Sequence, residues 1–510
     1  ALQRAPRQQA VITALQAQPD GIRRSDLDAT AAVLKTLHDK GWIEPVDLQI
    51  QTHPDRPAAA VTHTLNAAQQ QAVAAVIPSL DRYNAFLLEG VTGSGKTEVY
   101  LTVIEAALNR QRQALVLVPE IGLTPQLVAR FRQRFAVPLA ILHSGLGDRE
   151  RLSAWQQART GAAPIIIGTR SAIFTPLARP GVLVVDEEHD ASLKQQEGFR
   201  YSARDLAVWR ARQADIPVIL GSATPSLESL FNVEQRRYQH LVLPERTGTA
   251  GLPGYQILDI GLLTLEQGLS LPLIRQIRKH LDAGGQVLLF LNRRGFAPTL
   301  ICYDCNWVAA CRRCDARMTL HRRDGQLHCH HCGSQRPIDS SCPECQGTDL
   351  HPLGQGTERV EQALAEHFPD VERLRIDRDT TRRKGELDQL LERAQSGQGR
   401  ILLGTQMLAK GHHFPAVTLV GILDADHGLF STDFRASERM AQLIVQVAGR
   451  AGRHDQPGTV IIQTRHPDHP LLQLLVTRGY PAFAHAALAE RRAARLPPAT
   501  SLALIRAEST

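Results

Sequence analysis

Short apolar runs alternate with amphipathic stretches along most of the chain, and this alternation predicts the fold class. From Phe86 onward the runs "FLL", "ALVLV", "LAIL", "IIIG", "VLVV" and "PVIL" recur between stretches of helical periodicity. After a less regular stretch the rhythm resumes with "VLLFL", "RILLG", "VTLVGIL" and "TVIIQT". Continuous apolar runs of this kind are typical of strands that are buried on both faces of a parallel sheet. The sequence therefore predicts two α/β domains in tandem.

The same patterns predict where the domains begin and end. Before the first sheet, "QQAVITALQAQ" and "ATAAVLKTLHDKGWIE" have helical spacing, and Gly41 stands where the second helix would stop. A small winged-helix unit and a plain helical adaptor both fit this pattern. The expected divisions are 1–52 for the winged-helix-like domain, 53–62 for a linker, 63–240 for the first sheet domain, 241–299 and 349–480 for the second, 300–348 for an insertion within it, and 481–510 for the beginning of a further domain.

The net charge and the length of the apolar runs indicate what kind of partner the protein binds and where in the cell it works. The chain has 510 residues and a formal net charge of +7, which favours a polyanionic partner, although basic charge is also common on solvated surfaces. No apolar run approaches the ~20 residues needed to cross a bilayer, and the amino end lacks the apolar core of a signal peptide. We therefore expect a cytoplasmic protein. Because the chain begins at Ala1 and ends with "IRAEST", we also expect a fragment of a longer protein.

The stretch "GVTGSGKT", residues 90–97, has the form of a phosphate-binding loop. It follows the "FLL" strand and leads into the helical stretch "TEVYLTVIEAAL". In that context, backbone N–H groups and the helix dipole bind phosphates, Lys96 contacts the β- and γ-phosphates of a nucleotide, and Thr97 ligates Mg²⁺. The predicted phosphate-binding residues are Gly90, Gly93, Ser94, Gly95, Lys96 and Thr97.

The stretch "VLVVDEEHD" places an acidic cluster at the end of a predicted strand, where the metal ion and the attacking water of a nucleotide hydrolase lie. Asp186 would hold Mg²⁺ through its water shell. Glu187 would polarise the attacking water, because adjacent carboxylates on a strand end point to opposite sides and cannot both hold the metal. Without the phosphate loop, such a cluster is typical of a solvated strand end.

The stretch "QVAGRAGR", from Gln446 to Arg453, ends the second sheet domain. Arg450 and Arg453 share one face if this stretch is helical. Two arginines placed in this way can stabilise charge on a γ-phosphate that the other domain holds. We take Gln446, Arg450 and Arg453 as candidate catalytic residues, and a surface basic patch is the alternative interpretation.

Together these motifs resemble those of superfamily 2 helicases, in the order that this superfamily uses. "GVTGSGKT" is similar to motif I, "VPEIGLTPQ" to Ia, "GTR" to Ib, "DEEH" to II, "SAT" to III, "LFLNRRG" to IV, "GTQMLAKGHHF" to V and "QVAGRAGR" to VI. The closer resemblance is to the primosomal replication-restart helicases, the PriA (primosomal protein N′) family. It rests on "DEEHDASLKQQEGFRYSARDLAVWRA", "FLNRRGFAPTLIC", "GTQMLAKGHHFPAVTLV" and "LDADHGLFSTDFRASERMAQL", and on four cysteine pairs at that family's insertion point.

The resemblance implies an ATP-dependent DNA helicase of 3′ to 5′ polarity. Such a protein recognises stalled or abandoned forks and D-loops and promotes reloading of the replicative helicase. The implied partners are forked, single-stranded and duplex DNA, single-stranded DNA-binding protein, other primosome components and the loader of the replicative helicase, with no membrane. Relative to the family, we expect the domain that binds a DNA 3′ end to be missing and the carboxy-terminal domain to be incomplete.

The resemblance also implies roles for residues outside the phosphate site. Ser222 and Thr224 of "SAT" would couple hydrolysis to movement on DNA, with His189 as the link to "DEEH"; an ordinary turn after a strand is the alternative. Hydroxyl, amide and guanidinium groups suit contacts to the DNA backbone, which carry no sequence information. The residues expected to make them are Thr169, Arg170, Thr405 and Gln406, and ordinary surface hydrogen bonding is the alternative for each.

The stretch "KQQEGFRY" is similar to the aromatic-rich loop of the same family. Phe199 and Tyr201 would stack on bases while Lys194 and Arg200 neutralise phosphates. Alternatively, the two aromatic side chains pack against the motor. Upstream, "LNAAQQQAV" resembles the motif that contacts adenine, with Gln69 as the candidate base reader, and a polar helix start is the alternative.

All eight cysteines lie between Cys302 and Cys345, in four Cys-x-x-Cys pairs that predict two Cys₄ zinc sites. Two strand-like arms around Asp324-Gly325 would join the second pair to the third. Only five residues separate the first pair from the second, so the first pair must join the fourth. The predicted sites are Cys311, Cys314, Cys329 and Cys332 inside, and Cys302, Cys305, Cys342 and Cys345 outside. A redox role is the competing reading.

We therefore expect a monomeric α/β protein with two tandem RecA-like helicase lobes, a double Cys₄ zinc module inserted in the second lobe and a small winged-helix-like amino-terminal domain. Its expected cofactors are ATP, Mg²⁺ and two Zn²⁺. An RNA helicase of the same superfamily and a zinc-bearing scaffold without turnover are the alternatives. A basic surface on the zinc module is a further hypothesis, based on Arg312, Arg313, Arg317, Arg322 and Arg323.

Overall fold

The computed structural model describes residues 5–17, 22, 24, 27, 29–45, 64–120, 123–246, 253–291, 299–302, 305, 307–314, 318–321, 325–329, 332–353, 357–377, 380, 386–405, 408, 414–423, 425–429, 433–451 and 458–503. The chain divides into two compact units, Ala1–Pro57 and Ala58–Thr510. Of the predicted site residues, Gln406 and Arg453 lie outside the described residues, as do Arg317, Arg322 and Arg323 of the zinc module.

The first unit contains the two helices that its sequence predicts, α1 (Pro6–Ala17) and α2 (Ala31–Asp39). Gly41 has a φ of +67°, and its N–H donates to His38 O at 2.8 Å. A glycine in this left-handed conformation commonly ends a helix. The described part of this unit contains no strand, so a winged helix stays a prediction.

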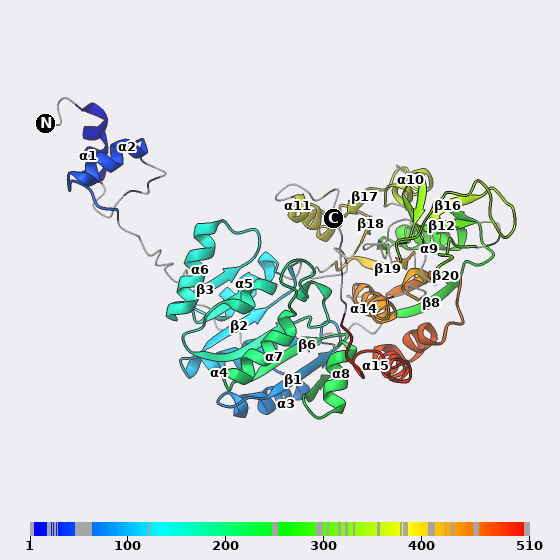
Figure 1. Cartoon of the computed structure of the whole chain (residues 1–510), viewed down its shortest axis with the longest axis horizontal. Helices are drawn as coiled ribbons and strands as arrows, with labels where there is room; N and C mark the ends of the chain where they lie inside the picture. The colour runs from blue at the N-terminus through cyan, green and yellow to red at the C-terminus, as the bar shows by residue number, and fades with distance from the viewer. Residues whose placement is uncertain are drawn as a thin grey trace. The chain divides into compact units, whose positions relative to one another are not determined.

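A seven-stranded parallel sheet forms the first lobe of the second unit (Figure 1). Its strands follow the spatial order β3-β4-β2-β5-β6-β1-β7, and every neighbouring pair is parallel. Strands β2, β4 and β6 are buried along their whole length, as their continuous apolar runs predict. The bounds are β1 Ala85–Gly90, β2 Gln113–Leu117, β3 Leu139–Leu142, β4 Ile165–Gly168, β5 Pro180–Asp186, β6 Val218–Ser222 and β7 Gln239–Leu243.

Helices cover both faces of this sheet, because successive side chains of each strand point to opposite faces. Phe86 and Leu88 of β1 join the core beneath α3, α4 and α5, whereas Ala85 and Leu87 join the core beneath α6 and α7. The helix bounds are α3 Ala67–Val76, α4 Lys96–Asn109, α5 Pro125–Arg134, α6 Asp148–Thr160 and α7 Ala203–Gln213, with short 3₁₀ helices η3 Ile77–Ser79, η5 Arg170–Phe174 and η6 Ala191–Leu193.

The second lobe is a six-stranded parallel sheet of order β17-β18-β11-β19-β20-β8. Its edge strands β17 and β8 are not among the apolar runs that the sequence pattern identifies. β17 alternates between half-buried and buried residues, and β8 has no buried residue. The bounds are β8 Gly254–Asp259, β11 Gln286–Phe290, β17 Arg373–Ile376, β18 Ile401–Gly404, β19 Val417–Ile422 and β20 Thr459–Thr464, and a two-stranded ribbon pairs β9 Leu265–Glu266 with β10 Leu269–Ser270.

Helices pack on both faces of the second sheet as well. α9 and α10 cover one face, and α11, α14 and α15 cover the other. α15 is broken at Gly479, where φ is 77° and ψ is −178°. Among the described residues, no helix combines the length and the apolar character that crossing a membrane requires. The bounds are α8 Leu227–Glu234, α9 Leu271–Asp282, α10 Thr357–His367, α11 Glu386–Gln395, α13 Asp426–Leu429, α14 Ala436–Ala448 and α15 Pro470–Ala493.

The cysteine-rich insertion leaves the second lobe after β11 and returns before α10. Antiparallel strands β12 (Thr299–Cys302) and β16 (Leu350–Leu353) pair at its base, with Thr299 opposite Leu353. Within it, β13 (Thr319–His321), β14 (Gln326–His328) and β15 (Gln335–Pro337) form an antiparallel sheet. The pairing of β13 with β14 confirms the predicted hairpin, in which Gly325 has a φ of +63°.

Candidate functional site

The stretch 90–97 connects the buried strand β1 to the start of α4, the place that a phosphate-binding loop occupies. Gly93 and Gly95 have φ values of +83° and +79°, which glycine adopts without strain. A Cβ atom at Gly90 would lie 2.4 Å from Ser94 Oγ, so only glycine fits there. Lys96 Nζ donates to Gly90 O at 2.8 Å. The lysine side chain therefore turns back to the first residue of the loop.

The predicted adenine-side residue also contacts this loop. Gln69 is buried, and its amide donates to Ser94 O at 2.9 Å. The side-chain oxygen of the same residue accepts the N–H of Asn66, which completes a capping box at the start of α3. Ser94 Oγ is buried and has no hydrogen-bond partner among the described residues. The structure therefore joins Gln69 to the phosphate loop, and both accounts of that residue fit: a helix cap and a group beside the nucleotide.

Asp186 is the last residue of β5, at the carboxyl end of the sheet, where the phosphate loop also lies. Burial and the neighbouring Glu187 raise the pKa of Asp186 to about 6, while Lys96 acts in the opposite direction. Tyr100 Oη donates to Asp186 Oδ1 at 3.1 Å. Sequence reasoning missed Tyr100, although it lies one helical turn after Lys96 and so faces the same side of α4. A Cβ atom at Gly221 would lie 1.5 Å from Tyr100 Oη, so the adjacent strand needs glycine there.

Glu187 follows the strand with a φ of +47°, an uncommon conformation for a residue other than glycine. Its Oε2 atom is buried, has no hydrogen-bond partner among the described residues and lies 3.6 Å from His189 Nδ1. The backbone therefore turns sharply between the two carboxylates, and Glu187 is not a strand residue as the sequence argument assumed. The turn still gives Asp186 and Glu187 different surroundings.

Glu188 is a buried residue that sequence reasoning passed over. Its carboxylate accepts the backbone N–H of Ser226 at 2.7 Å, the hydroxyl groups of Ser226 and Ser229 at 3.0 and 2.9 Å, and Arg204 Nη1 at 3.2 Å. Four donors on one buried carboxylate fix the segment that follows "SAT" against the "DEEH" turn. Nothing in the sequence distinguishes Glu188 from the acidic residues beside it, and only its tertiary contacts do.

His189 joins three motifs. Its Nδ1 atom lies 2.7 Å from Ser222 Oγ, and its Nε2 atom lies 2.6 Å from Gln446 Nε2 in the second lobe. Ser222 Oγ in turn accepts the N–H of Thr224 at 2.9 Å. The contact between His189 and Ser222 lies where the family resemblance implies a link to "SAT", and the contact with Gln446 adds the second lobe to it.

The carboxyl end of α14 lies against the phosphate loop. A Cβ atom at Gly449 would lie 2.9 Å from Thr92 Oγ1, so only a residue without a side chain allows this approach. Arg450 follows directly and is half-buried. The structure thus brings Gln446 and the segment around Arg450 to the nucleotide side of the first lobe, whereas Arg453 lies outside the described residues.

The residues expected to contact the DNA backbone differ in their exposure. Thr169 is only 3% exposed, and its N–H donates to Leu142 O. The guanidinium of Arg170 donates to Ser192 O at 2.9 Å and Lys194 O at 3.3 Å, so it holds the start of the aromatic loop. Thr405 lies half-buried at the end of β18.

The aromatic loop is an exposed hairpin. Lys194 bridges to Ser202 across its base, and Gly198 has a φ of +61° at its tip. Phe199 is 77% exposed, with its ring 5.8 Å from that of Tyr201. Phe174, which sequence reasoning missed, is 55% exposed and meets the Tyr201 ring edge-on at 4.8 Å. Three aromatic rings therefore form one cluster, and two of them are largely exposed.

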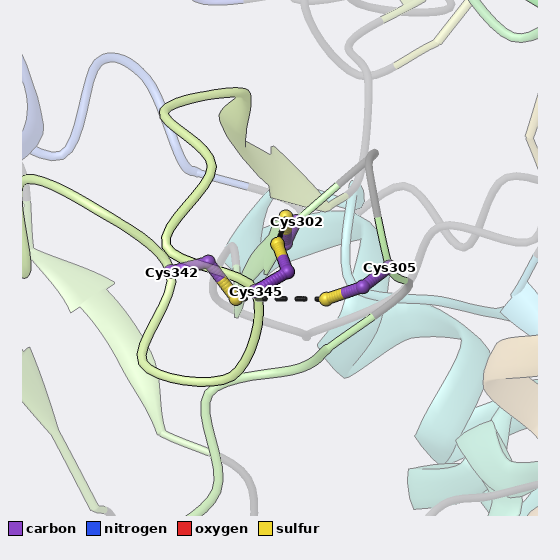
Figure 2. Close-up of side chains that lie close together, drawn as sticks. All are labelled: Cys302, Cys305, Cys342 and Cys345. Atoms are coloured by element: carbon purple, nitrogen blue, oxygen red, sulfur yellow. Dashed lines mark hydrogen bonds between the residues drawn. The ribbon is translucent and has the colours of Figure 1, made fainter.

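The eight cysteines form the two nested groups that their spacing predicts. Figure 2 shows the outer group of Cys302, Cys305, Cys342 and Cys345, with its sulfur atoms turned toward one another. In each group the sulfur atoms lie within 4.8 Å of one another, and the nearest pairs are 3.5 to 3.6 Å apart. Tetrahedral Zn–S bonds of about 2.3 Å require sulfur separations of about 3.8 Å. Both groups fit a zinc ion.

Backbone N–H groups favour the thiolate form in both cysteine groups. The N–H of Arg313 donates to Cys311 Sγ at 3.4 Å and lowers the pKa of that thiol to about 6. In the outer group, burial acts to raise the pKa of Cys342, but the N–H groups of Cys345 and Glu344 outweigh it and bring the pKa to about 7. Because zinc binds thiolates, one thiol of each group is ready for ligation near neutral pH.

Two parallel α/β lobes, a phosphate loop beside acidic residues in the first lobe, and a second lobe that reaches this loop define a two-lobe helicase motor. The family profile described as "DEAD/DEAH box helicase" matches residues 66–233, and the "Helicase conserved C-terminal domain" matches residues 353–455. Between them, the profile of the "PriA DNA helicase Cys-rich region (CRR) domain" matches residues 311–337.

Comparison with relatives narrows this class to one family. The chain is 49% identical over 497 residues to the replication restart protein PriA of Haemophilus influenzae. The aligned region covers 96% of this chain and 68% of the relative. It is 41% identical over 516 residues to the Bacillus subtilis protein of the same name, which covers 98% of this chain and 64% of the relative. The chain belongs to the PriA family of replication restart proteins, and it spans about two thirds of the length of these relatives.

Solved structures support the fold alone. The structure of RecG bound to a three-way DNA junction aligns with a TM-score of 0.50 and 15% identity, over 94% of this chain and 51% of that one. The DEAD-box helicase Mss116 bound to single-stranded RNA aligns with a TM-score of 0.51 and 15% identity, over 88% of this chain and 78% of that one. Because one neighbour holds DNA and the other RNA, the fold does not distinguish the two nucleic acids.

Proposed function

We propose that this chain is an ATP-dependent DNA helicase of 3′ to 5′ polarity that recognises stalled or abandoned forks and D-loops and promotes reloading of the replicative helicase. The observation that carries the proposal is the position of His189, which bonds both to Ser222 and to Gln446 of the second lobe. A motor with two lobes needs such a link, because hydrolysis moves the nucleic acid only if the second lobe responds to the state of the nucleotide.

The residues around the phosphate loop fit ATP with Mg²⁺. Buried Ser94 Oγ, without a partner among the described residues, and the glycine-lined loop suit phosphate oxygens. Lys96 exchanges its bond to Gly90 O for the β- and γ-phosphates, and Gln69 lies beside the loop on the adenine side. Mg²⁺, when bound, neutralises phosphate charge; Thr97 and Asp186 are its expected holders. Glu187 orients the attacking water and accepts its proton.

The second lobe supplies the cations for the same reaction. Gly449 packs against Thr92 of the phosphate loop, which brings the end of α14 close to bound phosphates. Arg450, the next residue, and Arg453 are therefore the proposed arginine fingers, which stabilise negative charge in the transition state.

The aromatic cluster is the proposed contact with single-stranded DNA. Phe199, Tyr201 and Phe174 offer faces on which bases stack, and Lys194 and Arg200 neutralise neighbouring phosphates. Arg170 already bonds two loop carbonyls, so it supports this loop and offers its remaining N–H groups to the backbone. The other proposed backbone contacts are Thr169, Thr405 and Gln406, and Ser222 and Thr224 transmit the nucleotide state.

The partners of the proposed function are those of replication restart: single-stranded DNA-binding protein, other primosome components and the loader of the replicative helicase. The motor itself acts as a monomer in this proposal. Its support is family membership and the two-lobe site, since one chain supplies both the phosphate loop and the residues that reach it.

The rate of ATP hydrolysis with single-stranded DNA or RNA of equal length tests the proposal. We expect DNA to raise the rate at least about tenfold and RNA to raise it much less. Equal or greater stimulation by RNA would favour an RNA helicase. Absence of phosphate release with either nucleic acid would favour a zinc-bearing scaffold that has lost turnover.

A further inference from the structure

Helix α8 follows "SAT" in the first lobe but packs into the second lobe. Leu227, its first residue, is fully buried in the hydrophobic core of the second lobe, and Leu230 and Phe231 pack against that core. Leu230 also packs against the core of the first lobe. Figure 1 shows α8 beside α15, which it contacts. This helix is therefore held by both lobes.

Side chains of the second lobe bind the polar groups at the start of α8. The second-lobe side chains come from α14 and α15. The backbone groups that they bind run from the last residue of "SAT" to the first residue of α8. Glu438 accepts the N–H of Leu227 at 2.9 Å, Tyr480 Oη donates to Pro225 O at 2.6 Å, and Gln442 Nε2 donates to Thr224 O at 3.3 Å. Tyr480 directly follows the break in α15 at Gly479.

These contacts are buried, and one of them involves a charged group. Glu438 is 4% exposed and is held in place by an ion pair with Arg491 of the same lobe. A buried polar group that loses its hydrogen-bond partner is left without compensation, which is unfavourable. If the lobes separated here, the Leu227 N–H and the Glu438 carboxylate would lose each other in an apolar core. The contact at α8 therefore has a large penalty against opening.

The first lobe holds the same point from the other side. Glu188 of the "DEEH" turn binds Ser226 and Ser229, at the start of α8. Two carboxylates of α8 itself pair with cations of the second lobe: Glu228 with Arg435 at 2.8 Å, and Glu234, the last residue of the helix, with Arg492. The start of α8 thus lies between the acidic cluster of the first lobe and helices α14 and α15 of the second.

We propose that α8 is the pivot on which the two lobes turn, and that Tyr480 and Glu438 are positioning residues that carry the motion of the second lobe to the "SAT" and "DEEH" segments. On the nucleotide side, Gln446 and His189 share a single exchangeable hydrogen bond between side chains. The lobes keep α8 in contact and open or close at that bond. This inference rests on the proposed function, because DNA-stimulated hydrolysis is what these residues position.

Tyr480→Phe tests the pivot with the smallest change. It removes the hydroxyl that bonds Pro225 and keeps the ring in the core. We expect DNA-stimulated kcat to fall at least about fivefold, with KM for ATP within about twofold of the wild type, because the phosphate loop is unchanged. Tyr255→Phe is the matched control: Tyr255 packs against the same core from β8, and we expect its removal of a hydroxyl to leave kcat unchanged.

Hydrogen exchange supplies a measurement that needs no DNA. We expect the amides of residues 226–229 to exchange slowly both without nucleotide and with a non-hydrolysable ATP analogue, since a pivot stays closed in both states. Fast exchange without the analogue would overturn the proposal. So would wild-type kcat in Tyr480→Phe, or an equal loss in Tyr255→Phe, which would indicate packing alone. A wild-type protein that DNA does not stimulate would count against the proposed function, and exchange would still decide the pivot.

Discussion

Lys96 is the single side chain on which the proposed nucleotide site depends most. Its ammonium group bonds to Gly90 O at the start of the phosphate loop, whereas the proposed DNA contacts lie on other segments. We expect Lys96→Ala to lower kcat for ATP hydrolysis by at least about a hundredfold, because a positive charge at the transferred phosphate is lost. DNA affinity, measured by fluorescence anisotropy, should change by less than about threefold.

The exposed Lys279 of α9 provides the control for that substitution. Lys279→Ala removes the same charge from the chain, so both kcat and the DNA affinity should stay at the wild-type level. Hydrolysis that survives in Lys96→Ala would place the nucleotide elsewhere.

Substitutions of Phe199 and Phe174 test whether the aromatic cluster binds single-stranded DNA. Their rings are 77% and 55% exposed and both meet Tyr201. Stacking of one base contributes about 1 to 3 kcal/mol, so each substitution by alanine should weaken binding of single-stranded DNA about five- to a hundredfold. KM for ATP without DNA should not change.

Leu262→Ala is the control for the aromatic substitutions, because Leu262 is a fully exposed apolar side chain on another segment. Unchanged DNA affinity in Phe199→Ala and Phe174→Ala would mean that these rings only pack against each other. The sequence identified Phe199 by its loop but not Phe174, since nothing local marks a phenylalanine in "RSAIF" as exposed.

At the scale of elements, the hydrophobic pattern predicted every central strand that the structure describes in the two lobes but only one of the four edge strands, β3, whose run is "LAIL". β2, β4 and β6 are buried on both faces and give continuous apolar runs. β7, β8 and β17 lie at sheet edges and are partly exposed, so polar residues interrupt their apolar pattern. A pattern that looks for burial therefore finds the middle of each sheet first.

Contacts between distant elements limited the prediction of the site. The phosphate loop and the acidic cluster follow from short local spacings, and the nested zinc sites follow from four Cys-x-x-Cys pairs whose side chains have one obvious shared use. The bonds from Glu188 to Ser226 and from Glu438 to Leu227 do not, because they join residues 38 and 211 positions apart. No periodicity places α8 in the core of the second lobe, because which helix fills that space is decided by the packing of the complete lobe.

The zinc module gives a prediction for a whole element. Its own core is small, so loss of a zinc ion should unfold it locally, while the two lobes keep their separate cores. We expect replacement of Cys311 and Cys314 by serine to lower the zinc content from about two ions to about one per chain. DNA-stimulated hydrolysis should stay within about twofold of the wild type, and unwinding or restart assembly should fall severalfold.

Substitutions of Arg312 and Arg313 can test the charge of this module without disturbing its fold, since both side chains are exposed beside Cys311. Their replacement by alanine should keep both zinc ions and still weaken unwinding or assembly if the module presents a basic surface. Full unwinding by a zinc-depleted variant would make the module dispensable, and a parallel loss of hydrolysis would make it a support for the motor.

At the scale of the whole molecule, the polar contacts between the described residues of the two lobes include two kinds that bear on the motion of the motor. At α8 the contacts are buried and include the bond from the Leu227 N–H to Glu438, and at the nucleotide they include the bond between Gln446 and His189. A cycle of ATP binding and hydrolysis that alters only the second kind would rotate one lobe relative to the other. DNA bound across both lobes would then be moved in one direction, because each state of the nucleotide favours one arrangement of the lobes.

Forks with defined arms test that direction. On a duplex with a single-stranded 3′ arm, the proposed motor loads on the arm and moves toward the junction, so we expect strand separation that depends on ATP. A fork with only a 5′ arm offers no strand of the required polarity and should stay paired at the same protein concentration. Gln446→Ala breaks the contact with His189 and should lower the number of base pairs separated per ATP hydrolysed, because the lobes lose the bond that reports the nucleotide. Equal unwinding of both forks would show that the motor lacks the proposed polarity. An unchanged number of base pairs separated per ATP in Gln446→Ala would mean that other residues couple the two lobes.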